Sequence, residues 1–245
     1  MKYNITTVSN SSYFLFLKVW IDSLYDKINL NNINNIYIID TGLKSEEKKY
    51  LSLFPKVNLL DTEINVQFDT LHGKGWSDSN YAKLPAIKKI IKQDLVPTYF
   101  IDVDSVFNID FTEILDFSSD ITVCSTSDRT KYVNSELIGS FYGFNSVDKA
   151  EKIIDEWYNL IINSKKISTK WRESPALSIF WKENKEKYKF HSISESIISA
   201  NLLSPKREKV YIYHMKSEGA CGYRTPEQRI KMPHCIEAVG RYINV

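Results

Sequence analysis

Segments typical of strands alternate with segments typical of helices through roughly the first hundred of the 245 residues. Residues 3–10, YNITTVSN, alternate β-branched and polar residues, as a short strand does. An amphipathic pattern with apolar spacings of three and four follows, which predicts a helix with Ser11 or Ser12 as its N-cap. This alternation favours an α/β layer structure with a largely parallel sheet at its front.

The same periodicities predict the remaining elements. Further strands are expected at 35–40, 57–61, 98–101, 121–125, 137–144, 188–194 and 209–215. Further helices are expected from about Ser45, at 81–93, at 146–164, at 174–184 with Ser174 as cap, and after TPEQ (225–228), where Pro233 interrupts the helix. Residues 68–80 are rich in turn residues and are expected to form a loop. Pro85 limits the second of these helices, because proline is costly beyond the first helical turn.

Composition restricts the class of protein. Hydrophobic residues make up 43% and charged residues 25% of the chain, as in soluble globular proteins, so wholesale disorder is not expected. The chain is long enough to bury a substantial core. With 32 basic and 30 acidic residues the net charge is +2, which gives no electrostatic reason to expect nucleic acid as a partner.

The cysteines and the N-terminus indicate a compartment. Cys124, Cys221 and Cys235 are odd in number and lack CxxC spacing, so neither a disulfide framework nor a zinc cluster is expected. The first ten residues contain no apolar stretch typical of a signal peptide, and no run approaches the roughly 18 apolar residues of a membrane span. We therefore expect a cytoplasmic protein without a transmembrane segment.

Polar residues follow several of the predicted strands. In an open α/β sheet, ligands bind outside the carboxyl ends of the strands, so these residues are candidates for a site. Each also has an ordinary explanation: Asp40 in DTG suits a turn, a single Asp-x-Asp is common, and His214 alone suits a partly buried histidine. Together, however, Asp102, Asp104 and His214 are expected on one edge of one sheet, where they offer the oxygen-rich ligand set that Mg²⁺ or Mn²⁺ accepts beside a phosphate.

The stretch YFIDVDSVF resembles the Asp-x-Asp signature of nucleotide-sugar glycosyltransferases with the GT-A fold. The resemblance extends to ITTVSN and IYIIDTG as the first two strands, to YAKLPAIKKI as the helix before the signature, and to GSFYGFN as the acceptor-side strand. YIYHMKSEG resembles the late His-x-Lys segment of glycogenin-like members. The resemblance implies one catalytic domain over 1–245, with a nucleotide-sugar-binding half at 1–107 and an acceptor-binding half at 108–245.

WRESPALSIF (171–180) is similar to a segment of retaining galactosyl- and N-acetylgalactosaminyl-transferases of the blood-group type. There a Trp followed closely by Glu-Ser begins a helix beside the reacting sugar, although the spacing differs by one residue here. The resemblance places Glu173 just outside the predicted helix and implies a catalytic role as nucleophile or acceptor ligand. A solvated glutamate beside a helix cap is the alternative.

The resemblance also implies roles for the other site residues. Asp102, Asp104 and His214 would bind Mn²⁺ or Mg²⁺ against the diphosphate of a donor such as a UDP-hexose, and a carbohydrate or other hydroxyl would be the acceptor. Lys83, Lys216 and Arg224 would add positive charge, and Trp76 would cover the nucleotide or stack on a sugar. The implied donor contacts are Thr7, Val8, Ser9, Asp40, Lys83, Asp102, Val103 and Lys216.

Two other functions remain open from the sequence. FIDVDSV also resembles the signature of haloacid-dehalogenase-like phosphatases, in which the first aspartate, here Asp102, is the nucleophile. That signature follows the first strand of the core, whereas three strands are predicted before it here. The second alternative is a nucleotide-sugar-binding module that has kept the fold but lost turnover.

Overall fold

The computed structural model of the chain describes residues 1–62, 74–126, 136–163, 173–201, 209–215, 226–239 and 242. Side chains are described for these residues except 74–80, 201, 226, 227, 234, 237 and 238. Among the helices in these ranges, none combines the length and the apolar character needed to cross a membrane.

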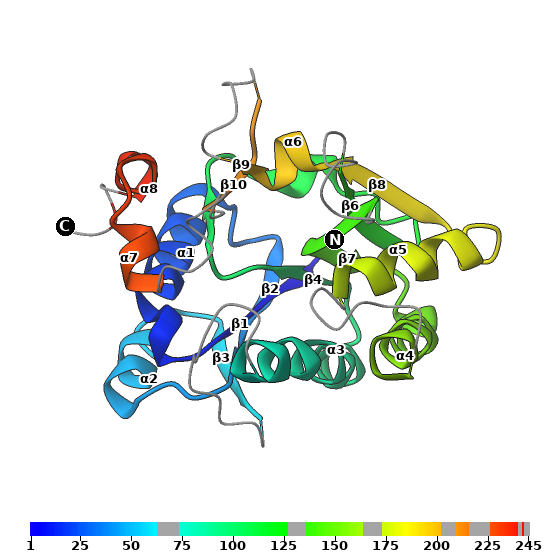
Figure 1. Cartoon of the computed structure of the whole chain (residues 1–245), viewed down its shortest axis with the longest axis horizontal. Helices are drawn as coiled ribbons and strands as arrows, with labels where there is room; N and C mark the ends of the chain where they lie inside the picture. Colours follow the sequence, from blue (N-terminus) through cyan, green and yellow to red (C-terminus); the bar gives the residue numbers. More distant parts are fainter. Residues whose placement is uncertain are drawn as a thin grey trace.

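The centre of the fold is a seven-stranded sheet in the order β3-β2-β1-β4-β7-β6-β8 (Figure 1). Its strands are β1 (Tyr3–Ser9), β2 (Ile33–Asp40), β3 (Val57–Asp61), β4 (Thr98–Ile101), β6 (Ile121–Ser125), β7 (Leu137–Phe144) and β8 (Phe190–Ser194). The first four strands pair in parallel, and β7 is antiparallel to both of its neighbours, β4 and β6. The predicted mixed, largely parallel sheet is confirmed.

Helices cover both faces of this sheet, because its central strands are buried on both sides and need an apolar partner on each. On one face α1 (Phe14–Lys27) packs against the inward residues of β1, β2 and β4. On the other face lie α3 (Lys74–Asp94), α4 (Val147–Asn163) and α5 (Glu173–Asn184). Figure 1 shows α1 and α3 on opposite sides of β1.

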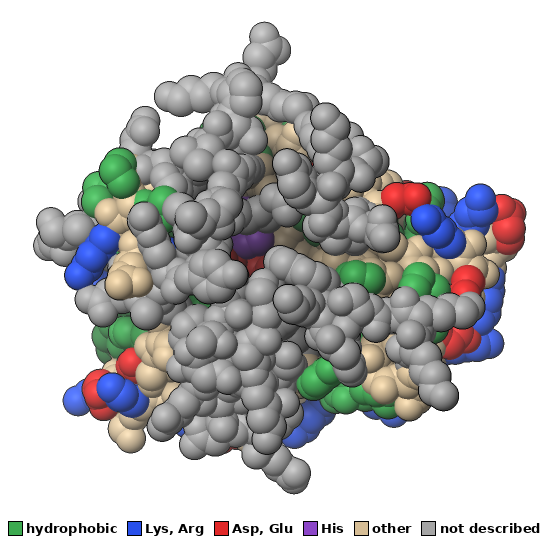
Figure 2. All heavy atoms as spheres, in the orientation of Figure 1, with side chains coloured by type: hydrophobic (Ala, Val, Ile, Leu, Met, Phe, Trp, Pro, Cys, Tyr) green, Lys and Arg blue, Asp and Glu red, His purple; other side chains and the backbone are tan. Residues whose placement is uncertain are grey.

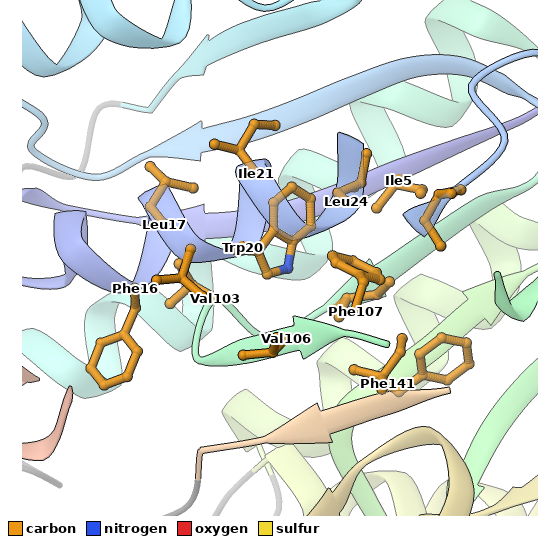
Figure 3. Packing of buried hydrophobic residues seen from close by; sticks show 14 of the residues in the cluster. Ile5, Phe16, Leu17, Trp20, Ile21, Leu24, Val103, Val106, Phe107 and Phe141 are labelled. Atoms are coloured by element: carbon orange, nitrogen blue, oxygen red, sulfur yellow. The ribbon is translucent and has the colours of Figure 1, made fainter. Parts of the chain in front are cut away.

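A second sheet of three short strands, in the order β5-β10-β9, packs beside α1. Its strands are β5 (Ser105–Phe107), β9 (Ala200–Asn201) and β10 (Ile212–His214). Figure 3 shows Trp20 of α1 next to Phe107 of β5, and the two rings meet edge to face at 5.4 Å between centroids. This contact anchors the small sheet on the core of the large one. The small sheet as a unit was not predicted, because strands of two or three residues leave no periodicity to detect.

Shorter helices complete the chain. Two single-turn 3₁₀ segments lie at η1 (Ser11–Tyr13) and η2 (Phe111–Ile114). The remaining α-helices are α2 (Ser45–Leu51), α6 (Glu195–Ile198), α7 (Pro226–Ile230) and α8 (Pro233–Val239). The final helix is interrupted before Pro233, as predicted: α7 ends at Ile230, and Pro233 begins α8, as its fixed φ and missing N–H allow.

Two helix starts also differ from the predictions. Asn10, and not Ser11 or Ser12, caps the 3₁₀ segment η1 that leads into α1, because its side chain accepts a hydrogen bond from the backbone N of Ser12 at 3.0 Å. The N-cap position of α1 itself is Tyr13. Residues 68–80 were expected to form a loop, but α3 already begins at Lys74 and continues through Pro85. Leu84 and Ile87 on either side of this proline are buried against the sheet. Their burial offsets the hydrogen bond that proline removes from the helix.

Candidate active site

The two acidic residues of the Asp-x-Asp motif lie in the short connection between the two sheets. β4 ends at Ile101 and β5 begins at Ser105. The backbone N of Asp102 donates to the carbonyl of Ser140 at 2.9 Å, which continues the β4–β7 ladder by one residue. The carbonyl of Asp104 accepts from the backbone N of Met215 at 2.8 Å, which does the same for β5 and β10. Both carboxylates are therefore held by ordered backbone on either side.

His214 completes a cluster with these carboxylates. Its Nε2 lies 2.8 Å from Asp104 Oδ1 and 3.9 Å from Asp102 Oδ2. One ligand atom from each of the three side chains can be chosen so that all lie within 4.8 Å of one another. Figure 2 shows a histidine and an acidic side chain near the centre of the face that it presents. The structure thus brings together the three residues that the sequence suggested as metal ligands.

The structural element that places His214 in the cluster differs from the predicted one. The three groups were expected on one edge of one sheet. His214 is instead the last residue of β10 in the small sheet, where it pairs with Ser105 in antiparallel register. The chain enters β5 directly after Asp104, so this antiparallel pairing places the end of β10 opposite the motif. The geometry is therefore produced by the meeting of two sheets.

Two buried cations also contact the acidic pair. Lys83 of α3 places Nζ 3.2 Å from Asp102 Oδ1, and 4.5 Å from the centroid of the Phe100 ring below it. Arg229 of α7 places one nitrogen 2.6 Å from Asp104 Oδ2 and 2.7 Å from the carbonyl of Met215. Arg229 was not among the predicted site residues. A single arginine in a short C-terminal helix carries no sequence signal that would have singled it out.

Glu173 lies beside the same cluster. Its Oε2 is 3.0 Å from Lys83 Nζ, and its Oε1 accepts a hydrogen bond from the Tyr142 hydroxyl at 3.3 Å. Glu173 is the first residue of α5, so the expectation that it would stand just outside the helix was wrong by one residue. Lys83 of α3 therefore bridges the carboxylate of Asp102, which follows β4, and that of Glu173, which begins α5.

Burial and charge act against each other on these groups. Burial would raise the pKa of Asp104, but the charges of His214 and Arg229 outweigh it and hold this pKa well below its ordinary value. Burial raises the pKa of Glu173, and the Lys83 ammonium opposes that rise only in part. For Lys83, burial lowers the pKa, yet the carboxylates of Asp102 and Glu173 raise it above its ordinary value. Asp104 and Lys83 are accordingly charged at neutral pH.

Gly139 on β7 makes room for the Glu173 side chain. A Cβ atom at Gly139 would lie 2.8 Å from Glu173 Cδ and 3.0 Å from its Oε2, closer than side chains approach. We expect Gly139→Ala to push the carboxylate away from Lys83 and to lower donor turnover by about 10-fold or more, since small displacements of reacting groups carry large costs. Turnover and the thermal unfolding temperature should be measured together. A variant with unaltered turnover would show that the carboxylate does not need this position.

The residues at the ends of β1 and β2 that were predicted to contact the donor differ in their surroundings. Thr7 is buried, and its hydroxyl has no hydrogen-bond partner among the described residues. Ser9 donates to the carbonyl of Asn10, and Val8 packs in the core on the α3 side. Asp40 accepts from the backbone N of Gly42 and Leu43 and lies 2.5 Å from Lys48 Nζ. The carboxylate of Asp40 therefore closes its own turn.

Val103, between the two aspartates, points its side chain into the core beside α1, as Figure 3 shows. Asp102 and Asp104 flank this buried residue in the turn between β4 and β5, and both of their carboxylates reach His214. Three further residues that the sequence suggested are not described: Lys216 and Arg224 fall in the range 216–225, and the side chain of Trp76 is outside the described set.

The chemistry of the cluster fits a divalent cation. Two carboxylates and one imidazole match what Mn²⁺ accepts, and few protein ligands leave positions for phosphate oxygens. The side chains of Asp102 and Asp104 are 26% and 14% exposed, so neither carboxylate is fully buried. Lys83 and Arg229 each contact one oxygen of these carboxylates, and each aspartate keeps its other oxygen toward His214.

Comparison with known proteins identifies the fold. No family model and no curated protein sequence matches the chain. Among solved structures, it is similar to the galactosyltransferase LgtC in complex with donor and acceptor sugar analogues, with a TM-score of 0.64 and 12% identity over 97% of this chain and 95% of that one. An active-site glutamine-to-glutamate mutant of LgtC matches with a TM-score of 0.63 and 12% identity, covering 93% and 94%. The chain therefore has the GT-A fold.

Proposed function

We propose that the chain is a metal-dependent glycosyltransferase. In this proposal it transfers a hexosyl group from a UDP-sugar to a hydroxyl of a carbohydrate or another acceptor, with retention at the anomeric carbon. One observation carries it: in a GT-A fold, Asp102, Asp104 and His214 converge where the chain leaves the parallel strand β4. Ligands of open α/β sheets bind at this edge.

Asp102, Asp104 and His214 would hold Mn²⁺ or Mg²⁺. A bound cation would supply charge stabilisation to the diphosphate as the sugar–phosphate bond breaks. Lys83 contributes a second, permanent positive charge next to Asp102, fixed by burial and by its two carboxylate partners. We extend this role to Lys216 and Arg224, which follow His214 in the sequence.

Glu173 would act on the opposite side of the reacting sugar, as nucleophile or as ligand of the acceptor. The contacts of Lys83 and Tyr142 fix its two oxygens in one orientation, as a reacting group requires. As nucleophile, the carboxylate would displace the nucleotide from the anomeric carbon, and the acceptor oxygen would then displace the carboxylate. Two inversions in sequence give net retention, the outcome that the resemblance of WRESPALSIF implies.

The donor would lie along the carboxyl ends of β1, β2 and β4. We assign its contacts to Thr7, Val8, Ser9, Asp40 and Val103, with residues 1–107 as the donor half and 108–245 as the acceptor half of one catalytic domain. The hydroxyl of Thr7, which has no hydrogen-bond partner among the described residues, supports this assignment, since a buried polar atom without a partner is costly unless a ligand satisfies it. Asp40 would contact the donor through the turn that it stabilises.

The phosphatase alternative receives no support. It requires the Asp-x-Asp motif to follow the first strand of a separate core. In the described part of the chain, β1, β2 and β3 belong to the same sheet as β4, so the motif follows the fourth strand of a single sheet. The non-catalytic binding module shares the donor site with the proposed enzyme and is distinguished only by its lack of turnover.

A thermal-shift panel tests the proposal. Nucleotide diphosphates and nucleotide sugars with different bases would be added with and without Mn²⁺, because a ligand that binds only the folded state raises its unfolding temperature. We expect an upward shift with UDP or a UDP-sugar that requires Mn²⁺. Shifts of equal size without metal, or no shift with any nucleotide, would contradict the proposal. Slow release of UDP from the shifting donor then separates the enzyme from the binding module.

A further inference from the structure

His214 has a second hydrogen-bonding nitrogen that faces away from the acidic pair. While Nε2 faces Asp104, Nδ1 lies 3.2 Å from the Ser199 hydroxyl. The Ser199 hydroxyl in turn lies 2.8 Å from the hydroxyl of Ser140. All three side chains are buried. A continuous chain of hydrogen bonds therefore runs from the back of the imidazole into the protein interior.

This chain joins the two sheets that supply the metal ligands. Ser140 lies on β7 of the large sheet, and its carbonyl also accepts the backbone N–H of Asp102. Ser199 lies between α6 and β9, and β9 pairs with β10 so that Asn201 is opposite His214. Ser140 thus contacts the backbone of Asp102, and its hydroxyl is linked through Ser199 to the side chain of His214. The two hydroxyls therefore connect, by side-chain contacts, two sheets that share no strand among the described residues.

Ser199 is placed to accept a hydrogen bond from the hydrogen that the imidazole of His214 would have on Nδ1 when Nε2 binds a metal. A histidine that coordinates a metal through Nε2 must have no proton there, so its hydrogen is on Nδ1. Nδ1–H would then donate to the Ser199 oxygen, and the Ser199 hydroxyl would donate to Ser140. A serine hydroxyl both donates and accepts, so the same contact also holds the ring when Nε2–H donates to Asp104 Oδ1. The ring therefore keeps one orientation with and without a cation.

We propose that Ser199, supported by Ser140, is a positioning residue that orients His214 Nε2 toward the cation. The inference rests on the proposed metal site and adds to it two residues that do not touch the metal. Partners of this kind fix the ring and its tautomer, and their loss typically weakens metal affinity by about 10- to 100-fold. A purely structural pair of buried serines would affect stability and leave the affinity unchanged.

The test is a titration of Mn²⁺ into the full chain, with free Mn²⁺ followed by electron paramagnetic resonance. Ser199→Ala is expected to weaken binding about 10- to 100-fold, and Ser140→Ala to weaken it less. Ser199→Thr keeps the hydroxyl and is expected to retain affinity close to that of the unaltered chain. Ser119→Ala is the matched control: Ser119 is also buried, donates to the carbonyl of Asp116 and accepts from Asn145, near the opposite end of β7.

The outcomes separate the two proposals. No Mn²⁺ binding by the unaltered chain would overturn the metal site and this inference with it. Tight binding by the unaltered chain and equally tight binding by Ser199→Ala would overturn the positioning role alone. If Ser199→Thr lost as much Mn²⁺ affinity as Ser199→Ala, the positioning role would also be overturned. The size of the side chain, and not its hydroxyl, would then determine the affinity. Unfolding temperatures confirm that each variant is folded, and Ser140→Ala carries the test if Ser199→Ala is not.

Discussion

Replacing Asp102 with asparagine is expected to lower Mn²⁺-dependent hydrolysis of a UDP-sugar by at least about 100-fold. The change keeps the shape of the side chain but removes the negative charge that faces both Lys83 and the proposed cation. The measurement is the rate of UDP release at saturating Mn²⁺. Fold stability should change little in this variant, because Lys83 keeps Glu173 as a partner and Asp102 is partly exposed.

Asp104→Asn is expected to lower the same activity, but it should also lower the stability of the fold. The Asp104 carboxylate is the partner of Arg229, which is buried, so Asp104→Asn leaves a buried guanidinium without its counter-charge. Removing one partner of such a pair typically costs about 3–5 kcal/mol in the free energy of unfolding. Asp155→Asn, an exposed aspartate paired with Lys88, is the control for both variants. Unaltered turnover in both motif variants would rule out the proposed metal bridge.

Lys83→Met is expected to lower the free energy of unfolding by about 3–5 kcal/mol. The lysine side chain is only 5% exposed and lies between Asp102 and Glu173, so its removal leaves two neighbouring carboxylates without a counter-charge. Methionine fills a similar volume, so the loss reports mainly on charge. Chemical denaturation at neutral pH, followed by circular dichroism, gives the change directly.

Lys88→Met provides a matched control on the same helix. Lys88 also contacts two carboxylates, Glu151 and Asp155, but these are about half exposed, at 49% and 51%, and Lys88 itself is 25% exposed. Exposed ion pairs contribute about 0–1 kcal/mol, so this variant should unfold almost like the unaltered chain. Equal stability losses in the two lysine variants would show that the network around Lys83 is not a buried one.

The sequence predicted the parts of the fold that depend on local periodicity. The strands 98–101, 121–125 and 137–144 were predicted at their observed bounds because most of their residues are apolar, aromatic or β-branched. The start of α3 could not be predicted in this way. Gly75 and the polar residues near it favour a loop locally, so the helix there depends on the rest of the structure.

The sequence predicted only those residues of the candidate site that lie at the ends of predicted strands. Asp102 and Asp104 follow a clear strand, and His214 was expected within the strand 209–215, of which only Ile212–His214 is observed as β10. The small sheet that carries His214 depends on pairing between β5 and β10, about a hundred residues apart, which no local pattern encodes. The contact of Arg229 with Asp104 and the bridge from Lys83 to Glu173 arise from the same long-range packing.

The most direct test of the central claim is an anomalous diffraction map from crystals soaked with Mn²⁺ and UDP. We predict a manganese peak at about 2.2 Å from carboxylate oxygens of Asp102 and Asp104 and from Nε2 of His214. The diphosphate of UDP should complete its coordination at the carboxyl end of β4. A manganese peak away from these three residues, or UDP bound at this edge without any metal peak, would contradict the account.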